Sequence, residues 1–204
     1  LGITAELTAE QIDFEPLKTA KWFYIEGYLS TSDTARIAVK QARELAKAHG
    51  VKIALFLSDP AMVQYARQGL EELLDDGVDL LFCNEQEALM FTNTENLDDA
   101  IAALKLNNQH IVITQGANGA TIIEPKQQFH VAGRHVDAVD TNGAGDAFAG
   151  AFLYAINAGL SLEAAAQLAI LISSEVVAQF GPRLAVENYA KLFEQFKSTQ
   201  QECA

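Results

Sequence analysis

The pentapeptide Ile53-Ala54-Leu55-Phe56-Leu57 is an unbroken apolar run in this chain of 204 residues. A β-strand has such a run when both of its faces are buried, because neither face then needs polar side chains. Strands of this kind belong mostly to parallel sheets that helices cover on both sides. The pentapeptide therefore predicts an interior strand of an α/β fold.

The segments on either side of this run alternate between strand-like and helical patterns. Such alternation is typical of a mostly parallel central sheet covered by helices. We expect strands at residues 22–29, 51–57 and 78–83, each followed by a helix, near residues 32–49, 61–74 and 85–91.

The second half of the chain has a different rhythm. Asn118-Gly119 is a strong signal for a tight turn, and short extended segments surround it, so we expect this region to be antiparallel. Ser161 is expected as an N-cap, and Gly181-Pro182 as a helix stop. We expect a helix at residues 97–106, extended segments at 111–114, 120–124 and 129–136, and helices at 144–158, 162–179 and 185–197.

The helices expected at 144–158 and 162–179 carry small and apolar residues on almost every face. We therefore expect both to be buried against the sheet. No segment has the composition of a linker, so residues 1–204 are expected to form a single α/β domain.

Composition and charge limit the classes of partner. With 50% hydrophobic residues the chain can bury a sizeable core, and its formal net charge of -13 would repel nucleic acid and anionic membranes. No run of Lys and Arg makes a local exception, and no stretch is long and apolar enough to cross a bilayer. We expect neither a nucleic-acid nor a membrane partner, so local donors must bind any phosphate.

The two cysteines, Cys83 and Cys203, are too few and too far apart in sequence for a disulfide framework or a zinc knuckle. This favours a reduced, cytoplasmic setting. Cys83 lies inside an apolar run and is expected to be a small core residue.

Residues 140–146, Asp-Thr-Asn-Gly-Ala-Gly-Asp, directly precede an expected helix. The small residues Gly143, Ala144 and Gly145 let backbone N–H groups gather where a helix begins, and this favours a bound anion. Asp146 lies beside this phosphate-binding turn and could take the proton from a hydroxyl that attacks a phosphoryl group. The alternative is that Asp146 is only a first-turn acid interacting with the helix dipole.

Two further polar segments follow expected strands, where ligands of open α/β sheets bind. Asn84 and Glu87 have the spacing of a capping box, which is the purely structural interpretation of that pair. Thr114, Gly116 and Gly119 surround a hairpin turn, in which Gly116 permits close backbone approach and the Thr114 hydroxyl could reach a phosphate.

Residues 140–148, Asp-Thr-Asn-Gly-Ala-Gly-Asp-Ala-Phe, resemble the C-terminal signature of the ribokinase-like, phosphofructokinase-B-type sugar and nucleoside kinases. Residues 84–87 match the Asn-x-x-Glu motif of that family, and residues 24–28 and 82–87 are most similar to the adenosine kinases within it. The resemblance implies an α/β three-layer sandwich with a mostly parallel central sheet. These residues would be its C-terminal, nucleotide-binding portion. The family's N-terminal acceptor-binding region and lid have no counterpart here, so we expect a part of a longer kinase.

The resemblance also implies roles for individual residues. The backbone of Gly143, Ala144 and Gly145 would stabilise the transferred phosphoryl group, and Asp146 would be the base. Asn84 and Glu87 would place Mg²⁺ and the phosphates through water. Asp140 would contribute to a monovalent-cation site, with K⁺ as an open alternative. The expected contacts to ATP are Asn84, Thr114, Gly116, Gly119, Thr141 and Asn142.

The implied activity is ATP-dependent transfer of the γ-phosphoryl group to a primary hydroxyl of a nucleoside. Adenosine is the leading candidate, which would place the protein in purine salvage. A sugar kinase of the ribokinase or fructokinase type, a regulatory module that binds nucleotide without transfer, and a homodimer remain alternatives. The context of Gly143 and Gly145 argues against a Rossmann dehydrogenase, because the third glycine would fall at Phe148 and helices follow.

Overall fold

The structure is a computed structural model that describes residues 6–202, with only the backbone described for residues 199–202. Contacts divide the chain into two compact units. Unit 1 runs up to Thr114 and includes Ile123–Gln128, and unit 2 comprises Gln115–Ile122 and the chain from Phe129 onward. The expectation of a single domain stays a prediction.

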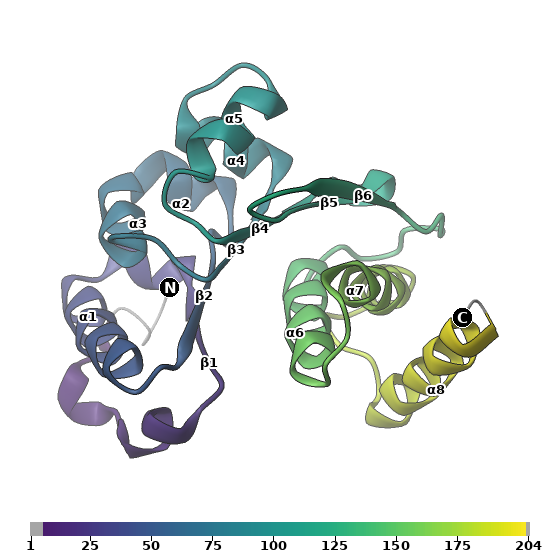
Figure 1. Ribbon diagram of the computed structural model, residues 1–204, viewed down its shortest axis with the longest axis horizontal. Helices are drawn as coiled ribbons and strands as arrows, with labels where there is room; N and C mark the ends of the chain where they lie inside the picture. Colours follow the sequence, from purple (N-terminus) through teal and green to yellow (C-terminus); the bar gives the residue numbers. More distant parts are fainter. Residues whose placement is uncertain (1–5, 203–204) are drawn as a thin grey trace. The chain divides into compact units, whose positions relative to one another are not determined.

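Unit 1 contains a parallel sheet with helices packed on it. Its strands are β1 (Trp22–Glu26), β2 (Lys52–Phe56), β3 (Leu80–Asn84) and β4 (His110–Thr114), and each neighbouring pair is parallel. Its helices are α1 (Asp33–Ala48), α2 (Pro60–Tyr65), α3 (Arg67–Leu74), α4 (Glu85–Thr92) and α5 (Leu97–Leu104), and its 3₁₀ turns are η2 (Ala9–Gln11), η3 (Glu15–Thr19) and η4 (Gly27–Thr31). Figure 1 shows α1 and α3 beside β1 and β2.

Two more strands, β5 (Gly119–Ile123) and β6 (Gln128–Ala132), complete a sheet whose order is β1-β2-β3-β4-β5-β6. The connection between them is short, and Glu124 N donates to Gln127 O at 2.8 Å across it. Neighbouring strands joined in this way are antiparallel. The expected mostly parallel sheet and the expected antiparallel region after it are both confirmed.

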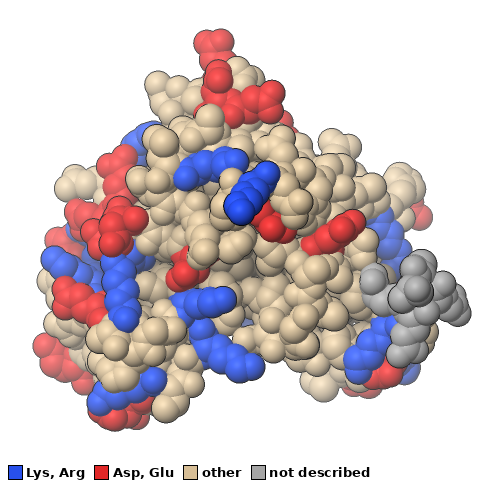
Figure 2. All heavy atoms as spheres, viewed as in Figure 1, with Lys and Arg blue, Asp and Glu red and all other residues tan. Residues whose placement is uncertain are grey.

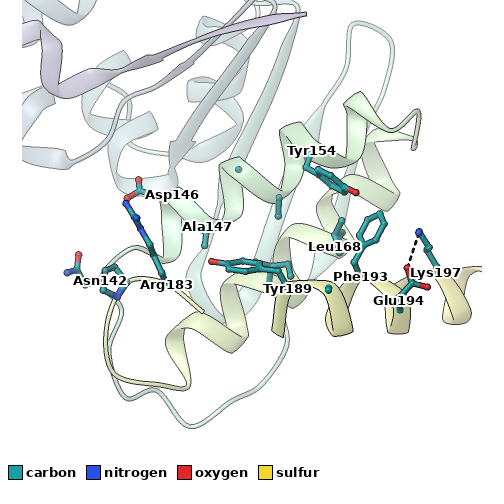
Figure 3. A pocket seen from close by; sticks show the side chains of 15 residues that line it. Asn142, Asp146, Ala147, Tyr154, Leu168, Arg183, Tyr189, Phe193, Glu194 and Lys197 are labelled. Atoms are coloured by element: carbon teal, nitrogen blue, oxygen red, sulfur yellow. Dashed lines mark hydrogen bonds and ion pairs between the residues drawn. The ribbon is translucent and has the colours of Figure 1, made fainter. Parts of the chain in front are cut away.

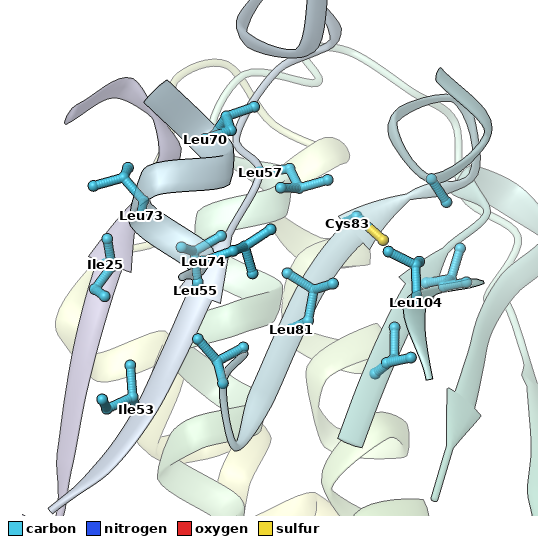
Figure 4. Close-up of a cluster of buried hydrophobic side chains, with 14 of the residues drawn as sticks. Ile25, Ile53, Leu55, Leu57, Leu70, Leu73, Leu74, Leu81, Cys83 and Leu104 are labelled. Atoms are coloured by element: carbon cyan, nitrogen blue, oxygen red, sulfur yellow. The ribbon is translucent and has the colours of Figure 1, made fainter. Parts of the chain in front are cut away.

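The core of unit 1 lies between its strands and α3. In Figure 4 the side chains of Ile25, Leu55 and Leu81 project from neighbouring strands toward Leu70 and Leu73 of the helix, and each of these residues is buried. Successive strands contribute β-branched or leucine side chains to one face, so the unit buries the apolar area that stabilises it.

Cys83 belongs to this core, as expected, and is completely buried. Burial raises the pKa of its thiol well above the ordinary value, and the charge of Glu87 acts in the same direction. Cys203 lies outside the described residues.

The single helix expected at residues 61–74 is wrong, because the structure breaks it into α2 and α3 at Ala66, whose φ of -129° and ψ of 28° are not helical. A tertiary contact accompanies the break. A Cβ added to Gly69 would lie 2.1 Å from the carbonyl oxygen of Ser30, so α3 can approach that backbone only with glycine there. The spacing of apolar residues in 61–74 does not indicate this contact.

Unit 2 consists mainly of helices: α6 (Ala144–Asn157), α7 (Leu162–Val177) and α8 (Val186–Glu202), preceded by the 3₁₀ turn η5 (Gly116–Asn118). Helices α6 and α7 pack side by side (Figure 1). The Ser161 hydroxyl accepts a hydrogen bond from Ala164 N at 3.2 Å, which confirms the expected N-cap.

Helix α6, which was expected to be buried, is exposed along one of its faces. Phe148 and Phe152 are buried and stacked, whereas Tyr154 is 54% exposed and Gly150 is exposed. The exposed face borders a cavity, described below. Apolar composition alone could not distinguish a face that packs from a face that lines a cavity.

On the face drawn in Figure 2, Lys and Arg side chains are scattered among acidic ones. No helix within residues 6–202 is long and apolar enough to pass through a membrane.

Candidate active site

Asn84 and Thr114 lie opposite each other at the carboxyl ends of β3 and β4, where they are register partners. The parallel pairing of the two strands brings together residues from two separate sequence motifs. Asn84 also begins α4 as its N-cap, so its side chain is held at the junction of strand and helix. The structure thus joins two of the expected nucleotide-contacting residues within unit 1.

Asn84 and Glu87 form a complete capping box. Asn84 Oδ1 accepts from Glu87 N at 2.8 Å, and Asn84 N donates to Glu87 Oε2 at 2.9 Å. The Asn84 side-chain amide also donates to Glu87 Oε1 at 2.7 Å. The structural interpretation of this motif is therefore correct, and it fixes the rotamer of both side chains.

Glu87 is only 1% exposed. Burial raises the pKa of its carboxyl group to about 7, with the nearby Asp59 charge adding to this effect, while the hydrogen bond from the Asn84 backbone opposes it. No Lys or Arg forms an ion pair with Glu87 in the part of the chain that the structure describes. A buried carboxylate without a counter-ion is a group that a divalent cation would stabilise in its ionised form.

These residues fit Mg²⁺ only in an indirect manner. Within residues 6–202 no group of three or more His, Cys, Asp or Glu side chains could hold a metal ion. Mg²⁺ usually keeps several waters and uses one or two carboxylates together with substrate phosphates. Glu87, with both oxygens already hydrogen-bonded by Asn84, suits contact through such waters.

Sequence reasoning missed a polar cluster at the carboxyl ends of β1 and β2. Ser58 has a positive φ of 76°, and its hydroxyl accepts from Gly27 N at 2.8 Å and donates to Glu26 Oε2 at 3.0 Å. Asp59 follows it and caps α2 through Ala61 N. The positive φ of a serine is a strained conformation, and strain of this kind gathers near functional sites. No sequence signal marks it.

The turn at residues 115–119 has the glycine geometry expected of it. Gln115 N donates to Gly119 O at 2.8 Å. Gly119 has a φ of 101°, and an added Cβ would lie 2.0 Å from Val131 O, so the turn itself accounts for this glycine. Gly116 has a φ of 57° and no atom near its missing side chain. The space beside Gly116 is therefore open, whereas the backbone of residues 131–133 packs against Gly119.

The turn of unit 2 that the sequence predicts to bind phosphate contains Gly143, the N-cap of α6, with a φ of 76°. An added Cβ there would lie 2.5 Å from Pro182 O, so both conformation and packing require glycine. The amide of Ala144 closes a turn to Thr141 O at 3.3 Å. The amides of Gly143, Gly145 and Asp146 have no acceptor among the described residues.

Asp140 holds this turn in place. Its carboxylate accepts from Asn142 N at 3.0 Å and from Gly181 N at 3.1 Å, and these backbone hydrogen bonds lower its pKa. The amide of Asp140 donates to Val177 O at the end of α7. Asp140 therefore has a structural task, and its expected role at a monovalent cation stays a prediction.

A cavity of about 910 Å³ opens beside the turn, between α6, α7 and α8. Asn142, Asp146 and Arg183 line one end of it, and Figure 3 shows the Arg183 side chain extending toward the Asp146 carboxylate. The remainder is largely apolar, with Tyr189 and Phe193 of α8 facing α6. Sequence reasoning missed Arg183 and both aromatic residues, because the order of helices does not say which faces meet.

A family model described as the pfkB family carbohydrate kinase matches residues 1–188. The chain belongs to the pfkB carbohydrate kinase family. This family membership confirms the resemblance and the fold class that it implied.

Among curated proteins, this pfkB chain is 30% identical to a probable fructokinase-3 of Arabidopsis thaliana, over 74% of this chain and 45% of that protein. It is 29% identical to an adenosine kinase of Schizophyllum commune, over 89% of this chain and 56% of that protein. The chain thus spans about half the length of the curated relatives it matches.

Solved structures agree with this assignment. An adenosine kinase of Sinorhizobium meliloti superposes with a TM-score of 0.88 at 33% identity, covering 94% of this chain and 59% of that one. A candidate ribokinase II of E. coli, solved with ATP and Mg²⁺, superposes with a TM-score of 0.83 at 26% identity and covers 93% and 64% of the two chains.

Proposed function

We propose that this pfkB protein is an ATP-dependent kinase that transfers the γ-phosphoryl group to a primary hydroxyl of a nucleoside, with adenosine the first candidate. The observation that carries the proposal is the first turn of α6. There Asp146 has no side-chain hydrogen bond or ion pair among the described residues, and it stands beside the unpaired amides of Gly143 and Gly145.

Phosphoryl transfer needs one base for the acceptor hydroxyl and one set of hydrogen-bond donors for the oxygens of the transferred group. Asp146 takes the proton of the acceptor hydroxyl, the hydroxyl oxygen bonds to the γ-phosphorus, and the bond from that phosphorus to the β–γ bridging oxygen breaks. The amides of Gly143 and Gly145 donate to the oxygens of the transferred group as charge gathers on them. ADP and the phosphorylated acceptor leave.

On the donor side we assign Asn84, Thr114, Gly116, Thr141 and Asn142 to the nucleotide, and Gly119 to the turn that supports them. Asn84 and Glu87 would hold Mg²⁺ through water, and the ion would supply positive charge for the phosphates. The relative solved with ATP and Mg²⁺ supports these two ligands. The proposal includes a cytoplasmic, purine-salvage role.

A sugar acceptor is the second candidate, because a fructokinase relative is as similar as the adenosine kinase relative. Assays of ADP formation with adenosine, inosine, ribose and fructose separate the two classes of acceptor. Turnover with nucleosides alone supports the first candidate, and turnover with sugars alone replaces it.

The decisive variant is Asp146→Asn in the full-length protein, which should lower kcat by about 10²–10⁴-fold while ATP affinity is kept. Glu163→Gln is the matched control, because Glu163 is likewise an exposed acid in the first turn of a helix, α7. If Asp146 only interacts with a helix dipole, both variants will keep wild-type turnover. A full-length protein that binds ATP without any turnover is a binding module, and one that neither binds ATP nor forms ADP contradicts the proposal.

A further inference from the structure

Arg183 lies in the segment between α7 and α8 and lines the same end of the cavity as Asp146 and Asn142. Figure 3 shows its guanidinium group pointing toward the Asp146 carboxylate. Arg183 thus places a positive charge near the first turn of α6, although it lies nearly forty residues later in the chain than Asp146.

The backbone that carries Arg183 is fixed on both sides. Pro182 packs against Gly143 so closely that no Cβ fits between them, and Gly181 N donates to Asp140 Oδ2 at 3.1 Å. The carbonyl of Arg183 itself accepts from Gln179 Nε2 at 2.7 Å. These contacts tie the position of Arg183 to the phosphate-binding turn, because Gly181 and Pro182 directly precede Arg183 and contact the two ends of that turn.

The Arg183 side chain, in contrast, has no partner among the described residues. Two cations line the cavity, and the other one, Lys197, pairs with Glu194 at 3.1 Å and lies over the Phe193 ring. Arg183 is exposed and makes no hydrogen bond or ion pair through its side chain within the described part of the chain. It is therefore free to bind an anion.

The proposed reaction offers a role for the unpaired guanidinium group of Arg183. The proposed reaction brings a carboxylate, Asp146, next to a highly charged triphosphate, in a protein whose net charge is already -13. A guanidinium group presents paired N–H donors that match two phosphoryl oxygens, and such contacts strengthen as charge develops during transfer.

We propose that Arg183 contacts the transferred phosphoryl group directly and stabilises its developing charge. This inference rests on the proposed function and adds a side-chain cation to the amides of Gly143 and Gly145. Arg183 is then a catalytic residue, whose contribution is greatest in the transition state.

Arg183→Gln tests the idea by binding and by turnover. Titration calorimetry should show ATP affinity reduced about 10-fold or more, and ADP affinity nearly unchanged, because only ATP carries the contacted group. The variant should lower kcat by about 10²–10³-fold with little change in the acceptor KM. Arg183→Lys should restore a part of the loss, since it keeps the charge without the paired donors.

Arg134→Gln is the matched control. Arg134 is also an exposed arginine of unit 2, but it pairs with Glu175 at 2.9 Å and lines a different cavity. It should keep wild-type affinities and kcat. In addition, millimolar guanidinium should partly rescue Arg183→Ala, which a purely structural role of the residue does not predict.

These experiments have outcomes that would overturn the proposed role of Arg183. Equal losses of ATP and ADP affinity without guanidinium rescue would make Arg183 a positioning residue and overturn the inference. Wild-type kcat in Arg183→Gln would do the same while the proposed function stands. A full-length wild-type protein that neither binds ATP nor forms ADP removes the proposed function itself, and the role of Arg183 falls with it.

Discussion

Asn84 and Thr114 are register partners at the carboxyl ends of neighbouring parallel strands, although thirty residues separate them in the sequence. Asn84 in turn binds both oxygens of the buried Glu87 carboxyl group. In unit 1, strand pairing therefore places Thr114 opposite Asn84, and the capping box joins Asn84 to Glu87. The most distinctive property of this part of the site is that burial makes the ionisation of the Glu87 carboxyl group cost free energy.

That cost predicts a pH-dependent stability. The Glu87 pKa is about 7 in the folded chain and near its ordinary value of 4.5 in the unfolded chain. Between these values the folded state binds one proton more, so the free energy of unfolding falls as pH rises from 4.5 to 7, by up to about 3 kcal/mol. Urea unfolding across this range should lose that slope in Glu87→Gln. Glu85→Gln, in the same helical turn, is the control and should keep it.

Magnesium should reverse part of this effect. Because the ion favours the ionised carboxylate, MgCl₂ should raise the melting temperature more at pH 8 than at pH 6. Glu87→Gln should respond equally at the two pH values. If wild type and variant respond alike, Glu87 does not help to hold the ion.

Gly143→Ala should destabilise unit 2 by about 1–3 kcal/mol, because alanine at a φ of +76° is strained and its Cβ would overlap Pro182. Gly150→Ala is a matched substitution in the same region, within α6, where an added Cβ meets no atom within 4 Å. It should stabilise the helix by about 0.5–1 kcal/mol. Denaturant titrations of the two variants should thus shift in opposite directions. The same direction for both would contradict the close packing at Gly143.

Arg43→Met should cost about 3 kcal/mol of unfolding free energy, since Arg43 is 2% exposed and donates to the carbonyls of Leu73 and Leu74 at the end of α3. Removing these donors leaves buried carbonyls unpaired. Arg134→Met, which breaks only an exposed ion pair, should cost less than about 1 kcal/mol. Thermal or urea unfolding of the two variants measures the difference.

The sequence predicted the fold well where local pattern decides it. Continuous apolar runs marked β2 and β3, and Ser161 marked the start of α7. The break at Ala66 could not be predicted from local pattern, and the approach of Gly69 to the Ser30 carbonyl that accompanies it is a contact between distant segments.

The candidate site shows the same division. Residues that lie in one motif, such as Asn84 with Glu87, were found together with their hydrogen bonds. Arg183 and Ser58 were not found, because their importance comes from what lies opposite them in space. A cation after a helix and a serine after a strand are ordinary in sequence, and only their geometry distinguishes them.

The burial of Cys83 has a practical consequence. A thiol that stays protonated inside β3 reacts with an alkylating reagent only after the strand has opened, so its labelling rate follows the rarest opening events of unit 1. Peptide mapping separates this label from any on Cys203. Cys83 is thus a natural kinetic probe of unfolding, located one residue from Asn84 in β3. Its labelling rate with and without nucleotide and Mg²⁺ measures whether these ligands reduce the opening of that strand.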